Sequence, residues 1–184
     1  MKTVLLILVA LFILLEPSFV LGKDVALTGA EKGYLLYSER RLDKAVEAYD
    51  IALSESSDPS LDALINFNKA VVFYKREEYP QAAIGFLKSM ATDDKVLEAK
   101  ASYNLGNTKY RLSQAFVDRN IDISIKMCEQ ALYYYKLAIE SGIKLKKAVY
   151  NYEFVKKKLD YLLIKKELNE DQDKKQQRSQ QQQQ

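Results

Sequence analysis

Asparagines that recur along this chain, with basic residues near them, are its best candidates for chemistry. Asn104 follows Asn68 by 36 residues, and Asn151 follows Asn104 by 47 residues. An amide side chain donates and accepts hydrogen bonds at once, so a column of asparagines could pair with an extended peptide backbone. Basic neighbours would favour a carboxylate ligand, and tyrosines offer flat contact surface with a polar tip. The candidate binding residues are Asn68, Lys75, Lys100, Tyr103, Asn104, Asn107, Tyr110, Arg111, Lys147, Tyr150 and Asn151. Phe154 and Lys158 follow on the same face of the last helix.

Catalytic and metal-binding chemistry have little support in the sequence. The chain has no histidine and one cysteine, Cys128, which we interpret as a small buried apolar residue. It contains no phosphate-binding loop, no G-x-S-x-G motif and no C-x-x-C pair. The adjacent carboxylates Glu77 and Glu78, like Asp93 and Asp94, are interpreted as solvated surface or helix caps. We therefore predict no enzymatic activity, no catalytic residue, no metal site and no cofactor.

The composition favours an all-α protein. Hydrophobic residues make up 48% of the 184 residues, whereas the chain has only six glycines and three prolines. This balance allows a buried core and favours helices. The net charge is +3, and much of the basic excess lies near the C-terminus. Because nucleic-acid binding usually needs a concentrated basic face, we expect no nucleic-acid partner.

The helices that would position the candidate residues follow a repeated pattern of small and aromatic side chains. The first helix of each repeat carries a small residue, and the small residues are Gly33, Ala70 and Gly106, 37 and 36 residues apart. The second helix carries an alanine, then an aromatic residue, then another small residue. These sets are Ala45, Tyr49 and Ala52; Ala82, Phe86 and Ser89; and Ala131, Tyr135 and Ala138. The pattern resembles the tetratricopeptide repeat (TPR), whose period is about 34 residues.

The resemblance implies an all-α TPR solenoid of about three helix-turn-helix repeats followed by a C-terminal capping helix. We predict a TPR domain over residues 23–164, with repeats near 26–59, 63–94 and 99–142 and a capping helix over 144–164. Gly142 is the expected stop of the third repeat. Glu153 occupies the small-residue position of the last helix, where no second helix needs to pack, so this helix has the polar outer face of a solenoid cap.

The third repeat is longer than the others. Gly106 precedes Ala131 by 25 residues, against 12 residues from Gly33 to Ala45, so 13 extra residues lie around Ala115–Met127. We expect longer helices or a protruding loop there. The insertion is either a tolerated surface feature or a partner-specific contact. After the capping helix, residues 165–184 are rich in lysine and glutamine and are predicted to be disordered beyond the first turns.

The N-terminus has the pattern of a secretory signal peptide over residues 1–22. Lys2 is followed by an unbroken apolar run, Val4–Leu15, then by Pro17 and a cleavage position at Gly22. The apolar run is shorter than the roughly 20 residues that a bilayer crossing needs. We expect cleavage after Gly22 and a periplasmic or secreted mature chain. The alternative is an uncleaved N-terminal membrane anchor, and we expect membrane contact only in that case.

The whole arrangement is similar to the small BatC-like TPR proteins of bacterial Bat (aerotolerance) operons. The signal peptide, the segment Tyr103–Arg111 (YNLGNTKYR), the long gap before the next helix, the closing segment Lys146–Leu159 and the glutamine-rich tail carry this resemblance. It implies a scaffold in a Bat-type complex of the cell envelope, linked to stress tolerance or aerotolerance. Its implied partners are other Bat proteins, including membrane-anchored von Willebrand A domain proteins.

The candidate site also resembles that of carboxylate-clamp TPR proteins, which use asparagine with lysine or arginine at such positions. Asn107 and Asn151 match the paired asparagines, and Lys147 is a suitable basic residue. The clamp is incomplete, so a chaperone tail of the EEVD type is not implied. Two hypotheses remain: a scaffold that binds a peptide segment in its concave groove, and a self-assembling structural module of the envelope without a peptide ligand.

Overall fold

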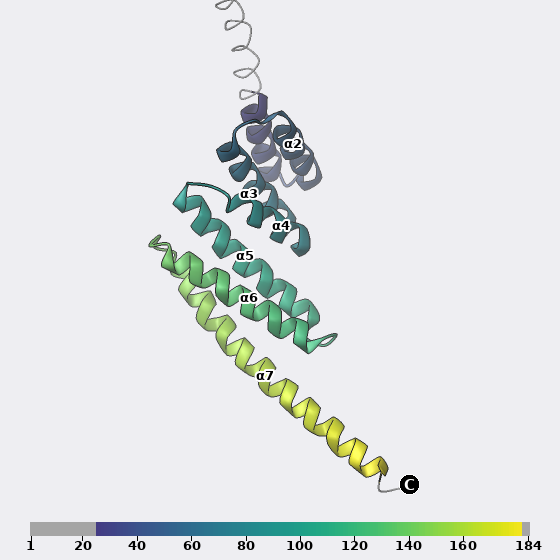
Figure 1. The fold of residues 1–184 in the computed structure, drawn as a ribbon. Helices are drawn as coiled ribbons and strands as arrows, with labels where there is room; N and C mark the ends of the chain where they lie inside the picture. Colours follow the sequence, from purple (N-terminus) through teal and green to yellow (C-terminus); the bar gives the residue numbers. More distant parts are fainter. Residues whose placement is uncertain (1–24, 182–184) are drawn as a thin grey trace, which may run out of the picture. The chain divides into compact units, whose positions relative to one another are not determined.

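The structure, a computed structural model, describes residues 25–181, which form helices joined by short turns (Figure 1). The predicted signal peptide over residues 1–22 lies outside the described residues. Within residues 25–181, no helix combines the length and apolarity that crossing a membrane requires. Contacts divide the chain into two compact units, the first ending at Glu98 and the second beginning at Ala99.

The first unit consists of two helical hairpins. Its helices are residues 25–38, α2 (Leu42–Glu55), α3 (Pro59–Lys75) and α4 (Tyr79–Ser89). The Asp58 carboxylate starts α3 by accepting hydrogen bonds from the backbone N–H groups of Ser60 (2.9 Å) and Leu61 (3.4 Å). Pro59 at the first helical position needs no hydrogen-bond acceptor. The helix therefore begins four residues before the predicted start of the second repeat at residue 63.

The two repeats of the first unit carry the glycine that allows close helix packing on different helices. In the first, a Cβ atom added at Gly33 would lie 2.6 Å from the Tyr49 ring, which is 1% exposed. In the second, a Cβ atom added at Gly85 would lie 2.7 Å from the Cβ of Ala70. The predicted small residue Ala70 is thus present at the crossing, but the glycine that allows it stands on α4. Phe86 beside it is fully buried.

The second unit holds the greater part of α5 (Lys95–Phe116), together with α6 (Ile121–Glu140) and α7 (Lys146–Gln181). The 13-residue insertion is absorbed by longer helices rather than by a protruding loop, since α5 has 22 residues and α6 has 20. Asn120 caps α6 by accepting from the Ile123 N–H at 3.1 Å. Gly142 has a φ of +76° just after α6, which confirms it as the stop of the third repeat.

The core of the second unit lies between α5, α6 and α7. A Cβ atom at Gly106 would lie 2.6 Å from the Tyr135 ring, as at Gly33 and Tyr49 in the first repeat. Val155 and Leu162 of α7 are buried in the same core. Cys128 is fully buried, as predicted, and its Sγ lies 3.0 Å from the Oγ of Ser113.

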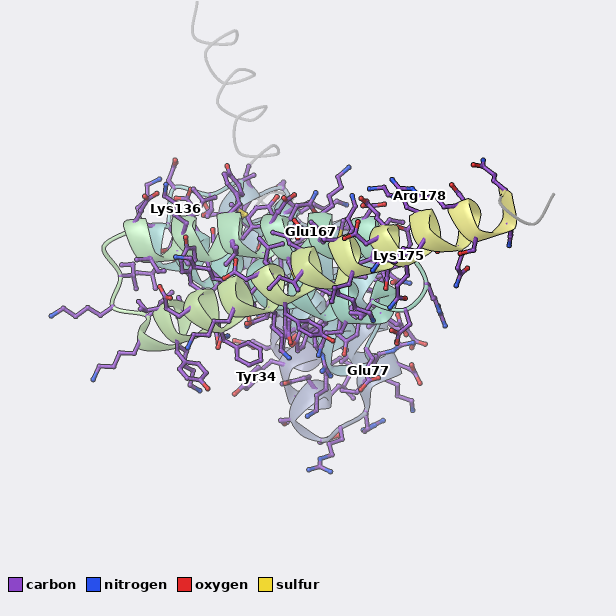
Figure 2. The ribbon with its side chains drawn as sticks, turned by 90° about the horizontal axis from the view of Figure 1, so that it is seen from below. Tyr34, Glu77, Lys136, Glu167, Lys175 and Arg178 are labelled. Carbon is purple, nitrogen blue, oxygen red and sulfur yellow. The ribbon has the colours of Figure 1, made fainter. Side chains whose placement is uncertain are left out.

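Residues 165–184 are predicted to be disordered beyond the first turns, but α7 continues as a helix to Gln181. Lys165 pairs with Asp118 at 3.0 Å and Lys166 pairs with Asp122 at 2.7 Å, which ties the first turns of the extension to the end of the α5–α6 hairpin. Lysine, glutamate and glutamine also favour helix where nothing opposes it. Figures 1 and 2 show α7 running on past the turn between α5 and α6, where α6 begins, with Lys175 and Arg178 on this projecting part.

Candidate functional site

The structure divides the predicted site residues between the two units. Asn68 and Lys75 lie on α3 in the first unit, with Asn68 half-buried and Lys75 exposed. The other nine lie on α5 and α7 in the second unit. The predicted column of Asn68, Asn104 and Asn151 is therefore split after its first member, and the site that can be built from contacts is the one on α5 and α7.

Four of the predicted residues form one stripe along α5. Lys100, Asn104, Asn107 and Arg111 follow each other at intervals of four, three and four residues, which places them on one face of a helix. Lys100 and Arg111 are exposed, and Asn104 and Asn107 are half-buried. The stripe thus presents two cations with two amides between them.

A matching stripe runs along α7. Lys147, Asn151, Phe154 and Lys158 repeat the same intervals of four, three and four residues. Lys147, Phe154 and Lys158 are exposed, and Asn151 is half-buried. The Lys158 ammonium lies 5.8 Å from the centre of the Phe154 ring, a favourable position for a cation.

The two stripes meet at a hydrogen-bonded amide pair. The Nδ2 of Asn151 donates to the Oδ1 of Asn107 at 2.8 Å, and the Tyr135 hydroxyl donates to the same oxygen at 2.8 Å. Asn151 Nδ2 also lies 3.3 Å from the Tyr103 hydroxyl, to which it donates. The Nδ2 of Asn107 and the Oδ1 of Asn151 make no hydrogen bond with any residue from 25 to 181. Three hydrogen bonds fix the pair, one between the two amides and two with tyrosine hydroxyls, and the pair retains one donor group and one acceptor.

Aromatic rings surround the amide pair. The Tyr103 and Tyr135 ring centres lie 6.1 Å apart, and Tyr110 meets Phe154 edge to face at 5.6 Å. Burial raises the pKa of Tyr110, whose hydroxyl is in any case protonated at neutral pH and can donate a hydrogen bond. These rings hold α5 and α7 at the distance that the amide contact requires.

The charge of this surface is positive. Lys100 and Lys147 are exposed and form no ion pair with another residue that the structure describes. Arg111 contacts the Gln114 side chain at 3.4 Å, and Lys158 lies against aromatic rings. A carboxylate bound near Lys100 and Lys147 would therefore meet two cations that form no ion pair within residues 25–181.

Asn104 and Tyr150 take less central positions than the sequence predicted. The Nδ2 of Asn104 donates to the backbone oxygen of Lys100 at 3.0 Å, so one of its amide hydrogens is used along its own helix. Tyr150 is 71% exposed and precedes the α7 stripe residue Asn151. Both remain on the helices that form the surface, but neither takes part in the amide pair.

Tyr135 belongs to the site although the sequence placed it only in the repeat core. Its ring fills the space over Gly106, and its hydroxyl positions Asn107. The residue type could have indicated this role. The second repeat has phenylalanine at this position, whereas a buried tyrosine hydroxyl usually needs a hydrogen-bond partner. That partner could not be identified before the helices were placed.

Comparison with solved structures supports the fold. The first TPR domain of Spaghetti (RPAP3), solved bound to the HSP90 peptide SRMEEVD, is similar with a TM-score of 0.61 and 16% sequence identity. The match covers 75% of this chain and 95% of that chain. No protein-family model matches the sequence, and no curated protein matches it. The likeness confirms the predicted fold class, an all-α TPR solenoid.

Proposed function

We propose that this chain is a protein-interaction scaffold that binds an extended acidic peptide segment on the α5–α7 face of its second unit. The observation that carries the proposal is the amide pair of Asn107 and Asn151. One amide presents a donor and the other an acceptor, which is the complement of a peptide group with its C=O and N–H. The hydroxyls of Tyr103 and Tyr135 fix the pair before a ligand arrives, which lowers the entropic cost of binding.

The charges on either side of the pair indicate the chemistry of the peptide. Lys100 and Arg111 lie on α5, and Lys147 and Lys158 lie on α7, so cations stand on both sides of the amides. An aspartate or glutamate side chain, or a C-terminal carboxylate, would form charge-assisted hydrogen bonds with them. The peptide seen on the similar RPAP3 domain, SRMEEVD, is also acidic. Because the clamp in this chain is incomplete, we propose the class of ligand and not that sequence.

The proposal extends to location and partners. The pattern of residues 1–22 supports a periplasmic or secreted mature chain, with an uncleaved membrane anchor as the alternative. The resemblance to BatC-like proteins supports a role in a Bat-type envelope complex linked to stress tolerance or aerotolerance. Membrane-anchored von Willebrand A domain proteins would then be the partners whose acidic segments are bound. The alternative is a self-assembling structural module of the envelope without a peptide ligand.

The test is affinity capture of partners with two variants of equal charge change. The first reverses two cations of the site, Lys100→Glu with Lys147→Glu. The matched control reverses Lys126→Glu with Lys156→Glu, which are also exposed and lie on α6 and α7 outside the two stripes. Full chains are used as bait in native envelope extract, and captured proteins are identified by mass spectrometry.

We expect the control to retain the partners of the unaltered chain and the site variant to lose them. Each charge-assisted contact contributes about 1.5–3 kcal/mol, so loss of two such contacts should weaken binding at least about a hundredfold. Asn151→Ala, which removes one half of the amide pair, should weaken capture in the same direction. Equal capture by both charge variants would contradict a binding role for this face.

A further inference from the structure

Helix α7 carries a second stripe of apolar residues that its own unit leaves largely exposed, although Phe154 at its edge also contacts Tyr110. Tyr150, Tyr161, Ile164 and Leu168 are 71%, 57%, 57% and 58% exposed, and Phe154 is 41% exposed. Five large apolar side chains on one exposed helix face are unusual for a surface that contacts only water. The stripe therefore needs an explanation beyond the packing of the unit.

The stripe has the spacing of a coiled-coil seam. With Lys157 included, the residues follow each other at intervals of four, three, four, three and four. This is the alternation of the two core positions of a heptad repeat. We name this set the α7 seam; its members are Tyr150, Phe154, Lys157, Tyr161, Ile164 and Leu168. At 1.5 Å per residue the seam is about 27 Å long.

The seam lies away from the packed face of the same helix. Ala148, Val155 and Leu162 are buried, and the last two belong to the core formed with α5 and α6. At about 100° per residue, the centre of this buried face is roughly 140° around the helix from the centre of the seam. A helix docked on the seam would therefore meet α7 from the side opposite to α6.

Charged residues on both sides of the seam indicate which helix fits. One flank carries Glu153, Asp160 and Glu167, and the other carries Lys158 and Lys165. In a parallel, in-register pair, Glu153 would face Lys158 of a second copy, and Asp160 would face Lys165 of that copy, because flanking residues pair five positions apart. An antiparallel pair would place acid against acid and lysine against lysine.

We propose that the α7 seam binds a second copy of this chain as a parallel, two-stranded coiled coil. Lys158 is already placed for this, since its ammonium lies 5.8 Å from the Phe154 ring and 6.0 Å from the Tyr161 ring, at the edge of the seam. Lys157 puts one charge among the core positions, which weakens the pair and makes the association reversible. Lys165 also pairs with Asp118 of its own chain, so in the dimer its charge would lie between Asp118 and Asp160 of the second copy.

The first test is the oligomeric state of the full chain, expressed so that any N-terminal processing takes place. Sedimentation equilibrium over a wide range of micromolar concentrations should show a monomer and dimer in exchange. Ile164→Ser should raise the dissociation constant at least about tenfold, because each dimer loses two buried side chains. Leu163→Ser is the matched control: Leu163 is the adjacent apolar residue, 42% exposed, and lies off the seam. It should leave the dissociation constant unchanged.

The second test determines whether the two α7 helices of the dimer are parallel and in register. In a parallel, in-register pair, residue 164 of one copy faces residue 164 of the other, so Ile164→Cys should form a disulfide-linked dimer under mild oxidation. Leu163→Cys should not, and the fully buried Cys128 should not react. Circular dichroism of each variant checks that the helices are retained. A monomer at every concentration, a dimer that Ile164→Ser does not weaken, or equal cross-linking at both positions would overturn the proposal.

Discussion

Replacing Gly106 with alanine tests whether the close approach of α5 and α6 determines both the stability of the second unit and the geometry of its site. Alanine adds a Cβ atom 2.6 Å from Cδ1 and 2.7 Å from Cε1 of Tyr135. The tyrosine ring is 1% exposed and has little room to move. Its hydroxyl holds Asn107, so a shift of the ring would also disturb the amide pair.

The magnitude follows from three opposing terms. Glycine to alanine in a helix interior normally stabilises the helix by about 1 kcal/mol. Overpacking a filled core costs about 1–3 kcal/mol. Loss of the 2.8 Å hydrogen bond from Tyr135 to Asn107 costs about 1 kcal/mol more. We therefore expect Gly106→Ala to lower the free energy of unfolding by about 1–3 kcal/mol and to weaken peptide binding with it.

Urea denaturation of the full chain measures the change, with two comparisons. Gly29→Ala is the milder control, because the nearest atom to its added Cβ would be the Cβ of Ala52 at 3.0 Å, whereas at Gly106 a ring atom lies at 2.6 Å. Combining Gly106→Ala with Tyr135→Leu removes the ring that the methyl group meets and should recover part of the loss. Higher stability of Gly106→Ala than of the unaltered chain would refute the reasoning, as would a double variant in which the two losses simply add.

Four further predictions concern other parts of the chain. Glu77 has a φ of +63°, so Glu77→Gly should raise the free energy of unfolding by up to about 1 kcal/mol in urea denaturation; a loss would contradict this. Burial raises the pKa of Tyr49 to about 12. The stability that the neutral Tyr49 side chain gives the folded state is therefore complete below pH 10 and is lost as the pH rises through 12. Between pH 10 and pH 12, the free energy of unfolding of Tyr49→Phe should fall by about 2–3 kcal/mol less than that of the unaltered chain. Cys128 is fully buried and burial raises its pKa, so iodoacetamide should modify it only on unfolding; rapid labelling would contradict its placement. Backbone amides of α7 after Leu168 should exchange hydrogen much faster than those near Val155, because residues 169–181 are all exposed.

The repeat packing could be predicted from the sequence because it depends on residue types at fixed intervals. Glycine at 33 and 106 predicted a close helix crossing, and tyrosine at 49 and 135 fills those crossings. The second repeat was harder to interpret, since its glycine stands on α4 at position 85. The turns gave no signal either, because Arg40 and Glu77 adopt positive φ angles that usually indicate glycine.

The pairing inside the site could not be predicted to the residue. Asn104 and Asn151 occupy equivalent repeat positions, but the contact forms between Asn107 and Asn151. Residues at equivalent positions of successive repeats do not face each other, because neighbouring helices meet with an offset that depends on turn length and crossing angle. The helical tail was missed for a related reason: composition predicted disorder, whereas two ion pairs from α7 to Asp118 and Asp122 fix the start of the extension.

The end of the solenoid explains how one helix can serve two surfaces. Glu153 stands where Gly33 and Gly106 allow a second helix to come close, so the repeat cannot continue by the same packing. A coiled-coil partner does not need that approach, because its axis stays about 8–10 Å away and its side chains interdigitate. The peptide face at Asn151 points toward α5, whereas Ile164 and Leu168 point away from the packed core. Substitutions at those two apolar residues can therefore separate self-association from peptide binding, which no change at the shared residue Phe154 could do.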